Sequence, residues 1–298
     1  MKSSFRSTYG SPRVLTTKEV EIPEINADEV LIRVMASTVN RTDCAILTGE
    51  PFVMRFFTGL FKPKYFATGT DFAGIIENVG NSVVDYKIGD RVFGFHDEGI
   101  GSHTEYLSYS TKKPFGLIPE NTSFETAAAS LEGAHYAINF MNKVQLKKGD
   151  HLLIYGASGA IGSALVQLAL TKEISISVVT NSETFEYFKS LGLKRVINYQ
   201  TQDFTKIDDS FDYIFDAVGK ISKEKATHLL KENGRYVTVD SLDVAKESSE
   251  DLKKLAEMYD QGELVAIIDK TYTLDEIVEA NRYVDSGRKK GSVVIKVQ

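Results

Sequence analysis

The stretch HLLIYGASGAIGSALVQLAL (His151–Leu170) is the most apolar run in the chain, and it carries no charged residue after His151. A membrane-spanning helix needs about 20 consecutive apolar residues, and the run approaches that length. Its interior favours a different structure, because Gly156, Gly159 and Gly162 lie between an apolar strand pattern and a segment of helical periodicity. The stretch therefore predicts a strand, a tight turn and a helix.

The turn has the pattern A-x-G-x-x-G from Ala157 to Gly162, which is the dinucleotide fingerprint with alanine in place of its first glycine. Gly159 lets the backbone approach a pyrophosphate, and Gly162 lets the helix pack closely on its strand. The free N–H groups at the helix N-terminus then receive the anion. A purely structural glycine turn is the alternative. The predicted cofactor contacts in this turn are Ser158, Gly159, Ala160, Ile161 and Gly162.

The composition is typical of a globular protein with one large or two ordinary domains: 298 residues, 42% hydrophobic, 26% charged, with a formal net charge of −6. This acidic balance gives no reason to expect nucleic acid or an anionic membrane as a partner. Cys44 is the single cysteine, which excludes an intrachain disulfide. Residues 1–15 are basic and rich in serine but lack the apolar core of a secretory signal. We therefore expect a cytoplasmic protein.

Two halves of the chain differ in pattern. From Arg13 to about Leu117, short alternating apolar runs are separated by Gly, Asp and Asn, which is typical of antiparallel strands. From about Phe124, a helical segment is followed by strands that alternate with helices, which predicts a parallel sheet with helices on both faces. The tail from Asp269 adds an amphipathic helix and a β run that need not belong to the parallel sheet. We predict one domain from residues 1–120 with 270–298, and a dinucleotide-binding domain at 121–269.

Three motifs lie in these halves: ASTVNRTD (Ala36–Asp43), GTDFAGIIENVGNSVVDYKIGDRVFG (Gly69–Gly94) and YGASGAIG (Tyr155–Gly162). Together they resemble the medium-chain dehydrogenase/reductase superfamily, specifically its zinc-free quinone oxidoreductase or zeta-crystallin-like branch. The first resembles the A-S-x-N-x-x-D of that branch, the second resembles the signature of its GroES-like domain, and the third resembles its cofactor turn. The resemblance covers almost the whole chain. It implies an α/β fold in which a GroES-like β domain is joined to a Rossmann domain with a doubly wound parallel sheet.

The same resemblance bears on zinc. In the alcohol dehydrogenases of the superfamily, a catalytic zinc takes a thiolate and an imidazole, and a structural zinc takes four thiolates. One cysteine excludes the structural site. By the match of motifs, Asn40 stands at the position of the catalytic cysteine, and Thr70 stands at that of the histidine in G-H-E. We therefore predict no metal site and no zinc, and we expect Cys44 to be a packed thiol rather than a nucleophile.

Without a Lewis acid, the accessible chemistry is hydride delivery from a reduced nicotinamide to an acceptor that is already electron-poor. A quinone or an α,β-unsaturated carbonyl meets that need, so we expect a small apolar or aromatic substrate and an NADPH-dependent reductase. One alternative is a non-catalytic NADPH-binding protein of the same fold. Another is an alcohol dehydrogenase or carbonyl reductase, which the missing zinc ligands disfavour.

Asn40 is the predicted catalytic residue, because its amide donates a hydrogen bond to a developing enolate or hydroquinone oxygen without titrating. A turn residue is the alternative. Asp43 either orients Asn40 or caps the following helix, and we favour the cap. Seven large apolar residues crowd the segment from Gly49 to Gly69, and we expect core packing to explain most of them: Phe52, Met54, Phe56, Phe57, Phe61, Tyr65 and Phe66.

The predicted substrate pocket holds Asp43, Phe52, His103 and Tyr136. Tyr136 stands where the branch often has the threonine of G-x-x-T-A, so its phenol either donates a hydrogen bond to substrate or narrows the pocket.

The choice between NADPH and NADH is made near the end of the second parallel strand, where NAD enzymes usually carry an acid that binds the ribose. Here Thr180, Asn181 and Ser182 precede the first acid, and uncharged groups tolerate a 2'-phosphate. The resemblance adds Tyr199 beside that phosphate and a cationic contact in the tail, for which a solvated turn is the alternative. NADPH is therefore the predicted cofactor and NADH the less favoured one. The remaining predicted cofactor contacts are Val218, Arg288, Lys289 and Lys290.

The parallel sheet is predicted to end near Val237 and Val239. The superfamily usually has a sixth parallel strand beyond this point, through which two subunits pair, but only SLDVAKES separates Asp240 from the next helix. We expect a monomer or an atypical dimer, with the exposed edge protected by nearby charges or by a helix that starts at Ser249. The alternative is that LDVA forms a short sixth strand.

Overall fold

In the computed structural model, residues 1–64, 66–96, 99–239 and 248–298 are described. The chain divides into two compact units, residues 1–132 with 247–298 and residues 133–246. The predicted domains, 1–120 with 270–298 and 121–269, differ from these units mainly in helix α7 (Ser249–Asp260), which packs against β7 (Phe115–Leu117) of the first unit. The predicted domain boundaries remain a proposal.

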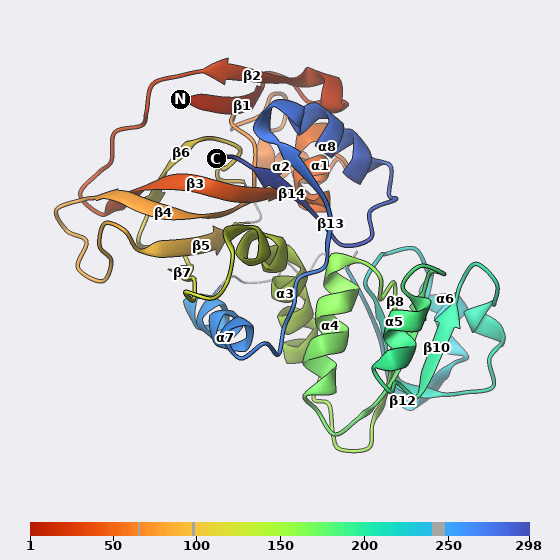
Figure 1. Ribbon diagram of the computed structural model, residues 1–298. Coiled ribbons are helices and arrows are strands. Elements are labelled where there is room, and N and C mark those ends of the chain that lie inside the picture. The colour runs from red at the N-terminus through yellow and green to blue at the C-terminus, as the bar shows by residue number, and fades with distance from the viewer. Residues whose placement is uncertain (65, 97–98, 240–247) are drawn as a thin grey trace. The chain divides into compact units, whose positions relative to one another are not determined.

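The main sheet of the first unit has the strand order β13-β14-β3-β4-β5-β7, and β6 pairs with β3. Its remaining strands are β3 (Glu29–Val39), β4 (Asp71–Val79), β5 (Arg91–Phe95), β6 (Tyr106–Ser110), β13 (Ile268–Thr273) and β14 (Ser292–Lys296). Figure 1 shows β14, from the C-terminal end of the chain, beside β3 from its first third, and the two strands pair antiparallel. The final β run therefore belongs to the first unit, which includes the residues 270–298 that the sequence assigned to the first domain.

A two-stranded sheet of β1 (Lys2–Arg6) and β2 (Leu15–Glu19) completes the strands of this unit. The sequence pattern predicted strands only from Arg13 onward and gave no signal for β1, because KSSFR contains a single large apolar side chain. The helices of the unit are α1 (Arg41–Thr48), α2 (Met54–Thr58), α7 and α8 (Ile277–Asp285), together with the first half of α3 (Phe124–Lys143).

The second unit contains a five-stranded parallel sheet in the order β10-β9-β8-β11-β12. Its strands are β8 (His151–Tyr155), β9 (Ser175–Thr180), β10 (Arg195–Asn198), β11 (Phe211–Asp216) and β12 (Leu230–Thr238), and its helices are α4 (Ala160–Leu170), α5 (Phe185–Ser190) and α6 (Lys223–Thr227). The chain moves outward from β8 in one direction through β10 and then in the other through β12. This reversal at β8 defines a doubly wound sheet, so the predicted fold class is confirmed.

The edge of the parallel sheet on the side of β12 is the one at which a sixth strand was in question. Within the described residues the sheet ends at β12, as predicted. The segment LDVA and the nearby charges Asp240, Asp243 and Lys246 lie outside the described residues. The helix expected to cover the edge is α7, which packs on β7 in the first unit; its covering of the edge stays a prediction. The predicted monomer or atypical dimer stays a prediction.

No helix among the described residues combines the length and the apolar character that crossing a bilayer requires. The apolar run from His151 to Leu170 divides into β8 and α4, as its three glycines predicted.

Candidate functional site

The turn between β8 and α4 depends on three glycines with different surroundings. Gly156 has a φ of 81°, and a Cβ there would lie 2.1 Å from Val218 Cγ2. A Cβ on Gly162 would lie 2.2 Å from the carbonyl oxygen of Gly156. In contrast, a Cβ on Gly159 would meet nothing closer than that same oxygen, at 3.5 Å. Gly156 and Gly162 are thus required for the backbone to close the turn. The position that a side chain of residue 159 would occupy is open.

The N-terminus of α4 offers donors to an anion. Gly159 is its N-cap residue, and no side chain caps the helix. The first N–H groups of an α-helix have no acceptor within the helix, and the helix dipole favours negative charge at this end. Ser158 and Ile161 are partly exposed in the same turn, whereas Ala160 is buried. A pyrophosphate therefore fits this turn, with Gly159 leaving room and α4 supplying N–H donors.

The predicted ribose contacts at the end of β9 fall into two groups. Thr180 and Asn181 are buried and shape the turn, since Asn181 Oδ1 accepts hydrogen bonds from the N–H groups of Glu183 (3.1 Å) and Thr184 (3.0 Å). Ser182 is exposed, and its N–H donates to Gln200. Tyr199 is also exposed. Of the four predicted residues, Ser182 and Tyr199 are the ones that face solvent.

Asp216, at the end of β11, is a residue of this region that the sequence analysis missed. Its fully buried carboxylate accepts hydrogen bonds from the N–H groups of Val218 (3.0 Å), Gly219 (2.9 Å) and Ile221 (3.1 Å). These bonds hold Val218 against Gly156. The available signal was an acid at the carboxyl end of a parallel strand, directly before a glycine-containing turn.

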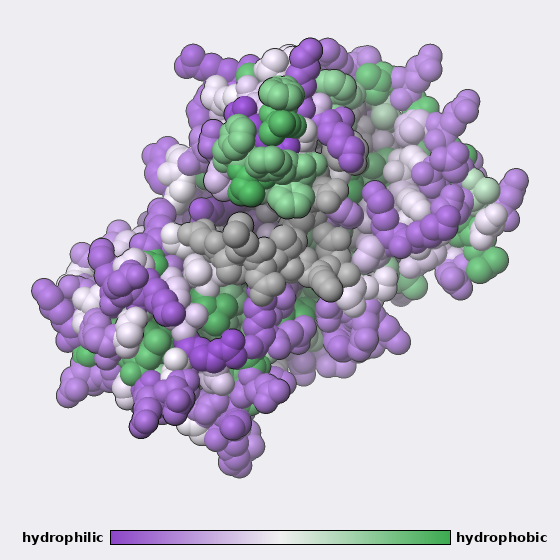
Figure 2. Space-filling model, turned by 180° about the vertical axis from the view of Figure 1, so that it is seen from behind, coloured by the Kyte–Doolittle hydropathy of each residue, from purple (hydrophilic) through white to green (hydrophobic). Residues whose placement is uncertain are grey.

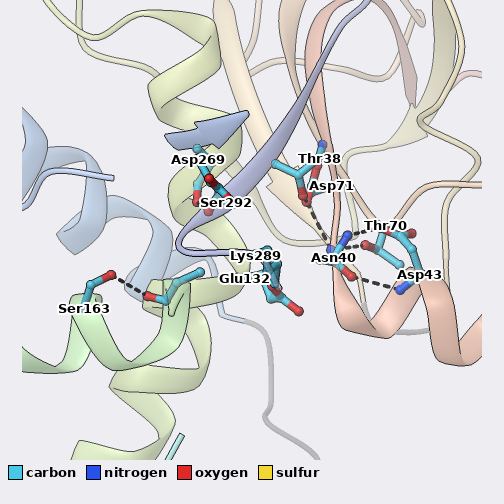
Figure 3. A network of polar contacts seen from close by, with 12 residues as sticks. Thr38, Asn40, Asp43, Thr70, Asp71, Glu132, Ser163, Asp269, Lys289 and Ser292 are labelled. Atoms are coloured by element: carbon cyan, nitrogen blue, oxygen red, sulfur yellow. Dashed lines mark hydrogen bonds and ion pairs between the residues drawn. The ribbon is translucent and has the colours of Figure 1, made fainter. Parts of the chain in front are cut away.

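In the first unit, Asn40 is the N-cap residue of α1 and is 1% exposed. Its Oδ1 accepts a hydrogen bond from the N–H of Asp43 (2.9 Å), and Asp43 Oδ2 accepts one from the N–H of Asn40 (3.0 Å). This is a capping box. The Asn40 amide also donates through Nδ2 to Thr70 Oγ1 (2.7 Å) and more weakly to Asp71 Oδ2 (3.4 Å), as Figure 3 shows. Asn40 is thus the N-cap residue, and Asp43 is the third residue of the helix, whose carboxylate completes the box and whose backbone N–H holds the Asn40 side chain.

The two positions that the sequence matched to zinc ligands are in direct contact. Asn40 and Thr70 carry an amide and a hydroxyl, and these bond to each other. Zinc sites in proteins use thiolate, imidazole and carboxylate ligands, so this donor set does not fit a zinc ion. Nowhere in the described ranges do three or more His, Cys, Asp or Glu residues gather as a possible metal-holding group.

Two carboxyl groups are buried beside Asn40. Burial raises the pKa of Asp43 to about 7. Burial, followed by the negative charge of Asp43, raises the pKa of Asp71 to about 7. Hydrogen bonds act in the opposite direction, because the Asp71 carboxyl accepts from the hydroxyl of Thr38 and from the N–H of Thr38 (2.6 Å). Each carboxyl therefore changes its charge near neutral pH.

These carboxyl groups should make the protein more stable in mild acid than at alkaline pH. Aspartate in an unfolded chain has a pKa of about 3.9, so the folded protein holds these protons more tightly. Their contribution is fully present below a pH of about 4 and is lost as the pH rises through about 7. We expect Asp71→Asn to flatten the dependence of Tm on pH across this window. Melts of Asp85→Asn, which changes an exposed carboxylate, provide the control, and a D71N curve parallel to that of the wild type would contradict the prediction.

A small cavity adjoins the capping box. Its volume of about 20 Å³ has room for roughly one water molecule. Its polar lining consists of Arg6, Asp43, Thr68, Thr70, His103 and Asn281. His103 is fully buried, Nε2 donates to the carbonyl oxygen of Thr38 (2.8 Å), and Nδ1 lies 2.9 Å from Thr68 Oγ1. Burial lowers the pKa of His103, so its ring is neutral at neutral pH. Asp43 and His103 thus share a cavity, but one much smaller than a quinone.

The segment around α2 corrects an expectation. Core packing was expected to account for most of its rings, yet the five phenylalanines are between 52% and 88% exposed: Phe52, Phe56, Phe57, Phe61 and Phe66. Figure 2 shows apolar side chains gathered on the surface at the place of α2. The reason is that α2 has only five residues, of which only Thr58 is buried, so this short helix directs few side chains into the core. Met54 is half-buried, and Tyr65 lies outside the described residues.

Phe52 and Tyr136 were also predicted to line the substrate pocket. Phe52 precedes α2, and its ring meets that of Phe56 edge to face, with centroids 6.0 Å apart. Tyr136 lies on α3, in the part of that helix that belongs to the second unit, and is half-buried against the ring of His135. Cys44 packs among apolar side chains, and burial raises the pKa of its thiol, which agrees with the packed thiol that the sequence predicted.

The three predicted cations of the tail have different environments. Arg288 is exposed, and its Nε donates to Ser286 Oγ (3.1 Å). Lys289 is nearly buried, and its Nζ lies 3.4 Å from Glu132 Oε2. The N–H of Lys290 donates to Asp269 Oδ2 (2.8 Å). Arg288 is therefore the most accessible of the three to a phosphate, and Lys289 already has an anionic partner.

Comparisons with known proteins agree with the geometry. Residues 26–120 match the alcohol dehydrogenase GroES-like domain, and residues 160–266 and 239–295 match the family described as zinc-binding dehydrogenase. The chain is 32% identical to 2-methylene-furan-3-one reductase of Solanum lycopersicum, over 99% of this chain and 79% of that protein. It is 27% identical, with the same coverage, to the chloroplastic NADPH-dependent alkenal/one oxidoreductase of Arabidopsis thaliana. The quinone oxidoreductase structure from Coxiella burnetii superposes with a TM-score of 0.89 at 26% identity, covering 100% of this chain and 99% of that one.

Proposed function

The chain belongs to the medium-chain dehydrogenase/reductase superfamily, among its quinone and alkenal oxidoreductases, and on that premise we propose that it transfers hydride from NADPH to a quinone or an α,β-unsaturated carbonyl. The proposal includes independence from zinc and a preference for NADPH over NADH. It also includes a cytoplasmic location and a monomer or atypical dimer.

The observation that carries the proposal is the hydrogen bond between Asn40 and Thr70. An alcohol dehydrogenase of this superfamily polarises its substrate with a metal held at these positions, and an amide bonded to a hydroxyl does not supply such a site. An acceptor reduced here must already be electron-poor. Quinones and conjugated carbonyls accept hydride because the resulting charge is delocalised onto an oxygen.

NADPH, when bound, supplies the hydride. The residues that would hold it are Gly159 and the N–H groups of α4 for the pyrophosphate, with Ser182, Tyr199 and Arg288 as the accessible candidates for the 2'-phosphate. With a quinone, the hydride would reduce the ring system and an oxygen would take up one proton from solvent. With an enone, the hydride would add to the β-carbon and the resulting enolate would take up one proton from solvent at the α-carbon. Each turnover would therefore consume one hydride and one proton. Asn40 donates a hydrogen bond to the acceptor oxygen as its charge grows.

The exposed phenylalanines around α2 support an apolar acceptor. Contiguous exposed apolar surface on a globular protein often marks a binding surface. Phe52 and Phe56 provide ring faces and edges on which an aromatic acceptor can stack. We propose that Phe52 contacts the acceptor, and the role of Tyr136 in the pocket stays a prediction.

The function is tested by following NADPH oxidation with a panel of quinones, 2-alkenals and simple ketones. We expect turnover with the first two classes and none with simple ketones, and we expect chelators to leave the rates unchanged. Activity confined to ketones or alcohols, or lost on chelation, would refute the proposal. Binding of NADPH with no turnover on any acceptor would favour the non-catalytic alternative.

NADPH should bind more tightly than NADH, and Arg288→Met should remove much of that preference. A hydrogen bond to a charged group contributes about 1.5–3 kcal/mol, or roughly ten- to a hundredfold in affinity. Fluorescence titrations of both cofactors measure the ratio of their Kd values. Arg282→Met removes another exposed cation, on α8, and should leave the ratio unchanged. Equal Kd values for the two cofactors in the wild type would rule the preference out.

A further inference from the structure

Arg55, on α2, is held in place by two aromatic rings and one hydrogen bond. Its Cζ lies 4.7 Å from the ring centroid of Tyr9 and 5.5 Å from that of Phe52, and a guanidinium within about 6 Å of a ring centroid is attracted to the ring face. Its Nε donates to the carbonyl oxygen of Gly49 (3.2 Å), the C-cap residue of α1. These contacts fix the position of the Arg55 side chain.

The groups that hold Arg55 are themselves anchored. The Tyr9 hydroxyl donates to the carbonyl oxygen of Gly59 (2.6 Å) and lies 2.9 Å from Thr58 Oγ1. Gly49 has a φ of 67°, and a Cβ there would lie 2.7 Å from Arg55 Nε and 2.8 Å from Tyr9 Cδ1. A side chain at this position would displace the guanidinium and the Tyr9 ring. The glycine therefore allows both groups to pack on the end of α1.

The two terminal nitrogens of Arg55 remain available to an anion. In the ranges that the structure describes, neither Nη1 nor Nη2 forms a hydrogen bond, and Nη2 lies 3.9 Å from Glu50 Oε1. The Glu50 side chain is 67% exposed, and such surface pairs contribute little to stability. The N–H groups of a guanidinium lie in its plane, so attraction to ring faces does not occupy them. Arg55 thus presents free donors beside apolar rings.

The proposed oxygen donor and the anchor of Arg55 lie at opposite ends of one helix. Asn40 is the N-cap residue of α1, and Gly49 is its C-cap residue. At about 1.5 Å per residue, their Cα atoms lie roughly 13 Å apart. The surface at the place of α2 is apolar (Figure 2), and Phe56 and Phe57 are 68% and 56% exposed. A molecule that reaches from Asn40 to Arg55 must therefore be long and largely apolar.

We propose, on the basis of the proposed function, that Arg55 binds a carboxylate at the far end of the acceptor. The preferred acceptor is then an α,β-unsaturated carbonyl compound with an apolar chain and a terminal carboxylate. The guanidinium fork matches a carboxylate with two parallel N–H···O bonds. A remote carboxylate leaves the conjugated carbonyl electron-poor, whereas a carboxylate conjugated with it would add electron density and oppose hydride transfer.

The test compares a 2-alkenal of twelve carbons that ends in a carboxylate with the methyl ester of the same compound. The wild type should prefer the acid by about tenfold or more in kcat/KM, since the ester cannot pair with Arg55. Arg55→Met should abolish this preference through KM, because the contact is remote from the reacting atoms. Arg55→Lys keeps the charge without the fork and should keep part of the preference. Arg282→Met, which removes an exposed cation from α8, is the matched control and should keep all of it.

Two further comparisons follow from the geometry. A 2-alkenal of six carbons with a terminal carboxylate is too short to span α1, so its preference over its own methyl ester should not depend on Arg55. Glu50→Gln removes the carboxylate that competes for the guanidinium and should increase the preference for the long acid by up to about fivefold. A decrease in E50Q, or an equal dependence of the short acid on Arg55, would contradict the proposal.

A probe that accepts no hydride separates this site from the proposed function. Calorimetry compares the saturated twelve-carbon acid with a hydroxyl at its far end and the methyl ester of that acid. The wild type should bind the acid more tightly, and R55M should bind the two equally. If the wild type reduces no acceptor but shows this Arg55-dependent preference, the proposed function fails and the carboxylate site stands. If it reduces acceptors and R55M lowers only Tm, Arg55 is purely structural and the inference is overturned. Arg55-dependent binding to phosphatidylglycerol vesicles, with no preference for the soluble acid, would overturn it as well.

Discussion

Asn40→Ala should lower kcat for a quinone or an enone by about 10²–10³-fold while leaving the Kd for NADPH nearly unchanged, because removing one donor to a developing oxyanion in a dry site costs about 2.7–4 kcal/mol. Asn40 has a suitable donor. One N–H of its amide is committed to Thr70 at 2.7 Å, and the contact of Nδ2 with Asp71, at 3.4 Å, is weak. The second N–H is the one that can turn to an acceptor oxygen at small cost.

The capping role of Asn40 requires a second variant. Loss of an N-cap destabilises a helix by about 1 kcal/mol, so Asn40→Ala alone would mix two effects. Serine caps helices about as well as asparagine, and Asn40→Ser keeps the cap while its short side chain withdraws the donor. Asn281→Ala removes another buried amide that lines the same cavity and should leave kcat within about twofold of the wild type, a change worth about 0.4 kcal/mol.

Steady-state kinetics measure kcat and thermal melts measure Tm, so together they separate the donor role of Asn40 from its capping role. Since Asn40 is 1% exposed, an acceptor reaches its amide only when a covering group moves. If N40S retains wild-type kcat, Asn40 is a cap and nothing more, and the donor must be sought elsewhere.

Gly162→Ala should prevent stable folding of the second unit, with a loss of about 3 kcal/mol or more. The new Cβ would lie 2.2 Å from the carbonyl oxygen of Gly156 and 2.8 Å from Ala157 Cα. Both atoms belong to the backbone at the end of the central strand β8, so they cannot rotate away as a side chain would. Urea denaturation measures the free energy of unfolding, and wild-type stability would show that the turn relaxes.

Gly159→Ala is the matched variant in the same turn. Gly159 has a φ of −82°, which alanine adopts freely, and its Cβ would have no neighbour closer than 3.5 Å. The fold should therefore survive. The Cβ would occupy the space through which a pyrophosphate approaches α4, so NADPH should bind at least about tenfold more weakly, or about 1.4 kcal/mol. Unchanged NADPH affinity in G159A would mean that the turn is purely structural.

The local sequence was sufficient where neighbours along the chain decide the structure. The strand, turn and helix from His151 to Leu170 were predicted because their apolar periods and glycines act within a few residues. The capping box of Asn40 and Asp43 is equally local, since the two residues are one helical turn apart. Strand β1 was missed because KSSFR has no apolar alternation, and its place is decided by pairing with β2.

The sequence by itself determined the fold class, the strand, glycine turn and helix from His151 to Leu170, and the absence of a cysteine–histidine pair at the matched zinc positions. Only the tertiary structure decided which polar groups are already engaged. Lys289 and Arg288 are neighbours in one basic run, yet Lys289 meets Glu132 from 157 residues away and Arg288 remains exposed. The phenylalanines around α2 have a core-like composition but are exposed in the described structure, because the short helix α2 buries only Thr58. Burial and charge pairing depend on contacts between distant segments, whereas periodicity and turn chemistry act within a few residues.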